Sequence, residues 1–152
     1  MGDINAIFKS YDIRGLYPQE IDEEVCRNIG YAFAKFLLEE DPLTSRIIVG
    51  VDMRLSSESL SDQFIKGIVS VGLDVIHLGL SSTDMLYYAS GSLESPGAIF
   101  TASHNPAEYN GIKLCRAYAA PIGEGSGLER IKNLSSTVIK VQDELNGTVT
   151  HL

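Results

Sequence analysis

The sequence has few cysteines, few cations and no long hydrophobic run, and each shortage excludes a class of protein. Cys26 and Cys115 lie far apart and form no metal-spaced pair, so we expect both to be reduced and buried. No apolar stretch approaches the ~20 residues of a membrane span. The N-terminus has no basic segment followed by an apolar one, so no signal peptide is visible. These features predict a cytoplasmic protein.

The charge balance restricts the partners. The chain has 12 Lys and Arg against 20 Asp and Glu, which gives a formal net charge of −8. The acidic residues are spread along the chain, so we expect neither a nucleic acid nor a membrane as partner. A small anionic ligand remains compatible, because a few local cations outweigh a distant net charge. The 152 residues, 44% of them hydrophobic, suffice for one domain with a substantial core.

Strand and helix patterns alternate along the chain. Strands are predicted at 47–51, 74–79, 97–101 and 111–115, and helices at 21–41, 56–71, 85–89 and 128–134. This alternation is typical of an α/β fold with a mostly parallel sheet. About nine loop residues separate the last two strands, which favours an antiparallel hairpin there. The tail at 149–152 looks like the beginning of another strand.

Polar loops at 52–57, 79–84 and 101–110 follow or adjoin strand ends. In α/β proteins, ligands bind where loops leave the carboxyl ends of the strands. These loops are therefore the candidate site. The segment at 11–15, also expected to be a loop, could join them.

Ser103, in the stretch TASHNP at 101–106, is the candidate reactive group. A hydrolase elbow would need Gly-x-Ser-x-Gly, which is absent around it. A serine at a strand end can instead carry a phosphate, held by loop amides, Asn105 and the nearby Lys113. The alternative is a polar turn closed by Asn-Pro, which composition alone favours.

Three other clusters each have two interpretations. Arg14 could hold a phosphate with a bidentate fork, or form a surface ion pair with Asp12. The charged pair Asp52 and Arg54 ends a strand, where helix capping is the favoured interpretation. The glycine-rich stretch at 123–127 could cradle an anion, but a lead-in to a helix fits its spacing better.

Three motifs together resemble one family. TASHNP followed by YNGIK at 109–113 resembles the phosphoserine loop of the α-D-phosphohexomutases, the phosphomannomutase/phosphoglucomutase superfamily. FKSYDIRG at 8–15 is similar to its N-terminal motif, and GVDMR at 50–54 to its Gly-x-Asp-x-Arg strand end. Order and spacing agree, and the match covers nearly the whole chain. One departure is SSTDM at 81–85, where the family often has a Pro-Thr-Pro-type turn.

The resemblance implies a domain organisation. Residues 1–146 would form domain 1 of a four-domain mutase, a three-layer α/β domain with a mixed, mostly parallel sheet between helices. Residues 147–152 would begin the linker to domain 2. The family's metal loop, Asp-Gly-Asp-x-Asp-Arg, belongs to that second domain and does not occur in this sequence.

The resemblance also implies an activity. The whole enzyme would be an isomerase that interconverts hexose 1-phosphate and hexose 6-phosphate, of mannose or glucose, through a bisphosphate intermediate. Mg²⁺ would bind phosphorylated Ser103 and three aspartates of domain 2. The implied catalytic residues are Ser103, Lys113, His104 and Arg14. The implied substrate-binding residues are Tyr11, Arg14 and Asn105.

Two functional hypotheses follow. Either the chain is the phosphoryl-transfer domain of a mutase, working with the remaining domains of the same polypeptide, or it is a sugar-phosphate binding or regulatory module without catalysis. Under the first hypothesis, the 152 residues alone should fold but should not turn over hexose phosphate.

Overall fold

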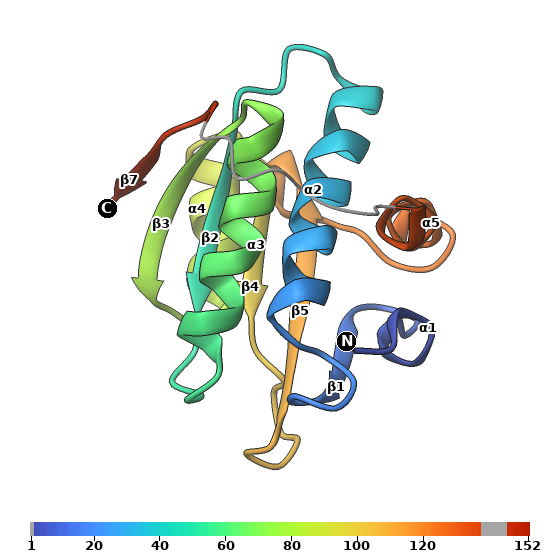
Figure 1. Ribbon diagram of the computed structural model, residues 1–152. Coiled ribbons are helices and arrows are strands. Elements are labelled where there is room, and N and C mark those ends of the chain that lie inside the picture. Colours follow the sequence, from blue (N-terminus) through green and yellow to red (C-terminus); the bar gives the residue numbers. More distant parts are fainter. Residues whose placement is uncertain (1, 138–145) are drawn as a thin grey trace.

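A computed structural model describes residues 2–137 and 146–152 of the chain. In this part a seven-stranded sheet lies between helices, with the strand order β1-β5-β4-β2-β3-β7 and β6 beside β5 (Figure 1). The strands are β1 (Ile13–Leu16), β2 (Arg46–Val51), β3 (Asp74–Leu80), β4 (Gly97–Phe100), β5 (Tyr109–Arg116), β6 (Ala120–Pro121) and β7 (Val149–His151). The predicted α/β fold is confirmed.

Strand directions place the polar loops at one edge of the sheet. β2 pairs in parallel with β3 and β4, and β3 pairs in parallel with β7. β5 pairs antiparallel with β1, β4 and β6, so among these strands β5 alone runs against the others. The predicted antiparallel hairpin is therefore β4–β5. The loops after β2, β3 and β4 all leave the carboxyl edge.

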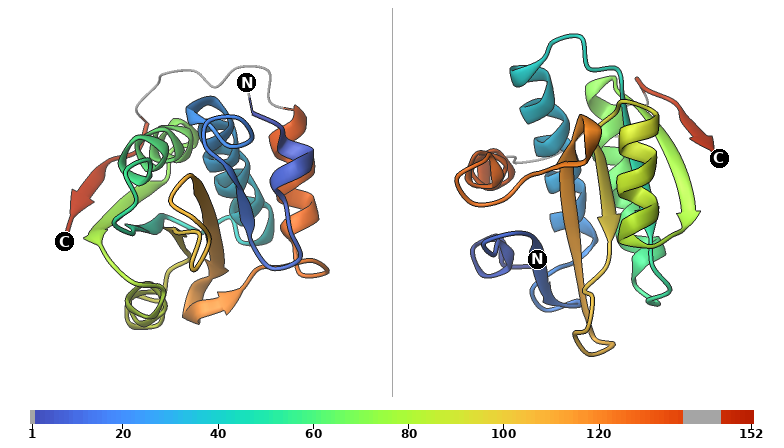
Figure 2. Two further views of the ribbon diagram at one scale, coloured as in Figure 1. Left: turned by 90° about the horizontal axis from the view of Figure 1, so that it is seen from below. Right: turned by 180° about the vertical axis from the view of Figure 1, so that it is seen from behind.

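Helices cover both faces of the sheet. They are α1 (Ile4–Ile7), α2 (Glu23–Glu40), α3 (Ser57–Val71), α4 (Thr83–Ser92) and α5 (Leu128–Thr137), with a 3₁₀ turn at Ala117–Ala119. α2, α3 and α5 pack on one face and α4 on the other (Figure 2). None of the helices in the described ranges is long and apolar enough to cross a membrane.

β2 shows why a strand in this position is apolar throughout. Ile47 and Val49 belong to the core beneath α2 and α3, whereas Ile48 belongs to the smaller core beneath α4. A strand covered on both faces buries alternate side chains in two different cores, so no polar alternation appears. Cys26 and Cys115 are both buried and unpaired, as expected.

α4 is longer than the predicted helix at 85–89. Ser82 accepts a hydrogen bond from the backbone N–H of Met85 (3.2 Å) and so caps the helix, which begins at Thr83. The helix then continues to Ser92 through Gly91. The sequence prediction missed the cap because Ser81-Ser82 read as part of a polar loop, although serine is a preferred residue for this role.

The N-terminal segment differs most from expectation. Residues 11–15 were predicted to be a loop, but Ile13–Leu16 form β1, with Ile13 opposite Ile112 and Arg14 opposite Gly111. A four-residue strand containing glycine has no visible alternation, which explains the error. Gly111 permits the close approach, because a Cβ atom there would lie 2.1 Å from the carbonyl oxygen of Ile13.

The C-terminal residues form the expected strand. β7 lies at the edge of the sheet beside β3, and the ring of His151 stacks on that of His77 with centroids 5.2 Å apart. Burial, and His151 beside it, lower the pKa of His77. The assignment of residues 147–152 to an interdomain linker stays a prediction.

The crossing of α2 and α3 is so close that glycine is required on both helices. A Cβ atom on Gly30 would lie 2.0 Å from the carbonyl oxygen of Phe64, and one on Gly67 would lie 2.2 Å from that of Arg27. Both contacts are with backbone, which cannot rotate away. The two helices must separate to accommodate any side chain at either glycine.

We therefore expect Gly67→Ala to lower the free energy of unfolding by about 1–3 kcal/mol, even though alanine favours helix more than glycine does. Urea denaturation followed by circular dichroism measures this. The matched control is Gly91→Ala in α4, where an added Cβ atom meets nothing within 4 Å. This control should be neutral or stabilising, and an equal loss in both variants would contradict the tight crossing.

Candidate active site

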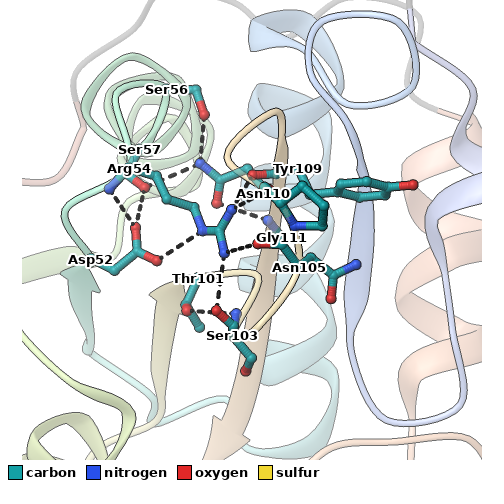
Figure 3. Close-up of polar contacts among 11 residues, drawn as sticks. Asp52, Arg54, Ser56, Ser57, Thr101, Ser103, Asn105, Tyr109, Asn110 and Gly111 are labelled. Atoms are coloured by element: carbon teal, nitrogen blue, oxygen red, sulfur yellow. Dashed lines mark hydrogen bonds and ion pairs between the residues drawn. The ribbon is translucent and has the colours of Figure 1, made fainter.

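The loop between β4 and β5 presents Ser103 at an exposed turn. The backbone N–H of Ser103 donates to Oγ1 of Thr101 (3.1 Å), and the N–H of Asn105 donates to the carbonyl oxygen of Ala102 (3.0 Å). Ser103 has φ 51°, in the left-handed region that non-glycine residues rarely adopt. Such strain concentrates at functional sites. The tight turn leaves the Ser103 side chain in solvent (Figure 3).

Arg54, from the loop after β2, holds this turn from its inner side. Its side chain is only 10% exposed, and its guanidinium donates to four backbone carbonyl oxygens of the β4–β5 segment (Figure 3). The acceptors belong to Ser103 (3.0 Å), Asn105 (2.8 Å), Pro106 (2.7 Å) and Tyr109 (2.9 Å). One side chain therefore fixes the path of the whole loop.

Asp52 and Asn110 complete the connection between the two loops. Asp52 pairs with Nε of Arg54 (3.3 Å) and accepts from the hydroxyl of Ser57 (2.7 Å). The buried amide of Asn110 donates to the hydroxyls of Ser56 (2.7 Å) and Ser57 (3.1 Å). The favoured prediction of helix capping for Asp52 was wrong, because its carboxylate binds a hydroxyl and the Arg54 amide, and α3 has no side-chain cap bond.

A second cluster lies where β1 meets β5. The carboxylate of Asp12, 5% exposed, pairs with Nε of Arg14 (3.0 Å) and with Nζ of Lys113 (3.4 Å). A terminal nitrogen of Arg14 also donates to Oδ1 of Asn105 (3.0 Å). Arg14 therefore forms the predicted ion pair and also reaches the Ser103 loop. Asp12 holds two cations at this edge of the sheet.

The remaining predicted site residues lie at the surface. His104 is exposed next to Ser103, and Tyr11 is 84% exposed before β1. In residues 2–137 and 146–152, neither side chain makes a hydrogen bond or an ion pair. The structure thus brings Arg14, Asn105 and Lys113 together and leaves Tyr11 and His104 open to solvent.

The loop after β3 lies close to the end of β2. The backbone N–H of Ser81 donates to the carbonyl oxygen of Val51 (2.8 Å), and a Cβ atom on Gly50 would meet Oγ of Ser81 at 2.2 Å. This explains the glycine at that point of β2. The stretch at 123–127 is the predicted lead-in to α5, where Gly125 and Gly127 have positive φ.

The chemistry that this site can support follows from its groups. Ser103 has no hydrogen-bonded base among the described residues, so the site lacks the nucleophile–base pair of a serine hydrolase. The nearby cations suit a group that carries negative charge. The described part of the chain contains no cluster of three or more His, Cys, Asp or Glu that could hold a metal ion.

Arg54 is the functional residue that sequence reasoning undervalued. It lies in the GVDMR motif, but the carbonyl oxygens that it binds are 49 to 55 positions away along the chain. No local pattern reveals such contacts. The sequence feature that could have indicated the contact is the presence of two polar motifs, GVDMR and TASHNP, at the carboxyl ends of neighbouring strands.

Comparison with known proteins agrees with this geometry. Residues 5–139 match the family model described as phosphoglucomutase/phosphomannomutase, alpha/beta/alpha domain I. A phosphomannomutase of Vibrio cholerae is 40% identical over 129 residues, which are 84% of this chain and 28% of that protein. A phosphomannomutase of Klebsiella pneumoniae is 43% identical over 129 residues, which are 79% of that protein.

A solved structure gives the same result. A phosphoglucomutase/phosphomannomutase family protein of Burkholderia thailandensis superposes with a TM-score of 0.84 at 27% identity. The superposition covers 99% of this chain and 33% of that one. From the fold, the serine loop and these matches, the chain belongs to the phosphoglucomutase/phosphomannomutase family, of which it forms domain I.

Proposed function

We propose that this chain is the phosphoserine-bearing domain of a phosphohexomutase, an isomerase that interconverts hexose 1-phosphates and hexose 6-phosphates of mannose or glucose. The observation that carries the proposal is the position of Ser103. It lies exposed on a strained turn, in a loop anchored by Arg54 and contacted by Arg14. Nothing in this arrangement activates the serine toward a carbonyl, and all of it suits a phosphate.

The proposed reaction proceeds in two transfers. Phosphorylated Ser103 gives its phosphoryl group to the free hydroxyl of a hexose 1-phosphate, so that the P–Oγ bond breaks and a bond to the sugar oxygen forms. The sugar hydroxyl loses its proton in this step, and the Oγ of Ser103 that leaves phosphorus takes up a proton, so that the serine ends as a free hydroxyl. The bisphosphate then reorients and returns its other phosphoryl group to Ser103, which leaves the hexose 6-phosphate. Such transfers depend mainly on positioning and charge neutralisation.

Cations of the site would supply that neutralisation. Lys113 and Arg14 are held by the shared carboxylate of Asp12. Lys113 is a point charge that can also exchange a proton, whereas Arg14 offers a fixed fork with donors left over for a substrate phosphate. Tyr11 and Asn105 would contact the sugar phosphate, and His104 would shape the loop.

In this proposal, Mg²⁺ would bind to the phosphate of phosphorylated Ser103. Residues 2–137 and 146–152 provide no carboxylate cluster for it, so within this part of the chain phosphorylated Ser103 would be the ligand, and the resemblance assigns the other ligands to the aspartates of domain 2. When bound, the ion would neutralise charge on the transferred phosphoryl group. The remaining domains, following a linker at 147–152, and a cytoplasmic location belong to the same proposal.

A turnover assay tests the function. The 152-residue chain and the four-domain protein would be supplied with Mg²⁺ and with glucose 1-phosphate or mannose 1-phosphate. We expect turnover by the four-domain protein and none above background by the chain alone, since the implied metal aspartates lie outside it. Comparable turnover by the 152-residue chain would refute the proposal that residues outside this chain are needed for catalysis. Binding of hexose phosphate without turnover in both would favour the non-catalytic module.

A further inference from the structure

We propose that Arg54 is a positioning residue for the Ser103 phosphate, and that it acts through the peptide groups of the loop. By collecting carbonyl oxygens on the inner side of the loop, Arg54 turns the positive ends of the same peptide units outward, toward the phosphate. This inference rests on the proposed function, because it concerns a phosphorylated Ser103.

All the hydrogen-bonding capacity of Arg54 is committed to the protein. A guanidinium has five N–H donors. Four of them serve the loop carbonyls and the fifth faces Asp52. Arg54 therefore has no donor left for a phosphate. Its influence on Ser103 must pass through the loop, in contrast to Arg14, whose bonds to Asp12 and Asn105 use only two of its donors.

The geometry of the peptide bond fixes the direction of that influence. In a trans peptide the C=O of one residue and the N–H of the next point in opposite directions. The loop peptides are trans. Because the carbonyls of Ser103 and Pro106 point to Arg54, the N–H groups of His104 and Ala107 point away from it. Neither N–H has an acceptor in the part of the chain that the structure describes.

Two backbone amides of this loop, at His104 next to the exposed Ser103 and at Ala107, are thus available to an anion. Free backbone N–H groups of a turn can hold phosphates by their partial positive charges. The N–H of Ser103 itself is already bound to Thr101, so the outward-pointing amides are those of His104 and Ala107. They stabilise the doubly charged form of a Ser103 phosphate and so lower its second pKa.

Lysine in place of Arg54 separates charge from orientation. It keeps one positive charge near the loop but cannot reach four carbonyls with a planar fork. If Arg54 acts through peptide orientation, Arg54→Lys should lose the stabilisation of the Ser103 phosphate. If Arg54 acts only as a positive charge, Arg54→Lys should behave as the wild type.

The experiment uses the 152-residue chain with phosphoserine incorporated at position 103 during translation, so that it needs no turnover. The ³¹P NMR signal is titrated with pH in the wild type, in Arg54→Lys and in a phosphoserine peptide of residues 101–106. We expect the phosphate pKa of the wild type to lie below that of the peptide. In Arg54→Lys it should rise by about 0.5 unit.

The control variant is Lys66→Ala, which removes a cation of α3 that, among the described residues, makes no hydrogen bond or ion pair with the loop. Its titration should match the wild type, and circular dichroism checks that each variant folds. A folded Arg54→Lys with the wild-type titration would overturn the proposal. Should Arg54→Lys fail to fold, the wild type alone tests the proposal. The NMR chemical shifts of the amide protons of His104 and Ala107 must then change with pH at the same midpoint as the phosphate signal. Amides that do not titrate would also overturn it.

This test is independent of the proposed function. The phosphate is placed by translation, so a chain that never accepts phosphate from a sugar can still show the effect of Arg54. Conversely, if the wild-type mutase were phosphorylated at another serine, the proposed role of Ser103 in the reaction would be refuted. The titration result for Arg54 would still hold.

Discussion

Ser103→Ala is expected to reduce the turnover of the proposed full-length mutase by on the order of 10⁴ to 10⁶-fold, because the variant has no atom to carry the phosphoryl group. Folding should be unaffected, since the side chain is exposed. Steady-state assays with hexose 1-phosphate, Mg²⁺ and activating bisphosphate measure the loss, and circular dichroism checks the fold.

The matched control is Ser136→Ala, which removes an exposed hydroxyl on α5 that donates to the carbonyl oxygen of Lys132 (2.9 Å). It should retain normal turnover. A folded Ser103→Ala with turnover within tenfold of the wild type would show that another residue carries the phosphate.

Lys113→Ala should reduce kcat by about two to three orders of magnitude, equivalent to about 2–4 kcal/mol of transition-state stabilisation. In the proposed reaction the ammonium of Lys113 would act mainly when charge moves between serine and sugar. Other groups would also hold the substrate in the ground state, so KM should change little. Asp12 keeps Arg14 as a partner in this variant, and the domain should stay folded.

Arg14→Ala should differ by raising KM as well as lowering kcat, because its fork would hold the substrate in both ground and transition states. The comparison of kcat and KM in the two variants therefore separates their roles. Near-normal turnover in a folded Lys113→Ala would remove Lys113 from the chemistry and leave it as a partly exposed strand residue paired with Asp12.

The layers of the fold were predictable because they depend on local patterns. The apolar run at 47–51 indicated a strand covered on both faces, and Ile48 indeed faces a different core from Ile47 and Val49. The loop between β4 and β5 was predicted for the same reason, since it separates two such runs, although β5 begins at Tyr109, inside the predicted loop. β1 was missed because its stability comes from pairing with β5 and from the small size of Gly111, neither of which shows in residues 11–16.

The organisation of the site was predictable only in part. The sequence brought Ser103, Asn105 and Lys113 together because they are near neighbours along the chain. The carboxylate that gathers Arg14 and Lys113 is Asp12, which lies 101 positions from Lys113. Arg54 likewise acts on carbonyl oxygens, which every residue possesses and no sequence pattern distinguishes.

Phosphopeptide mass spectrometry of the proposed full-length mutase, after incubation with a hexose 1,6-bisphosphate and Mg²⁺, tests the central assignment most directly. The account predicts one phosphate on the peptide that contains TASHNP, at Ser103, and none on that peptide in Ser103→Ala. Phosphate found reproducibly at a different serine, with Ser103 unmodified, would contradict it.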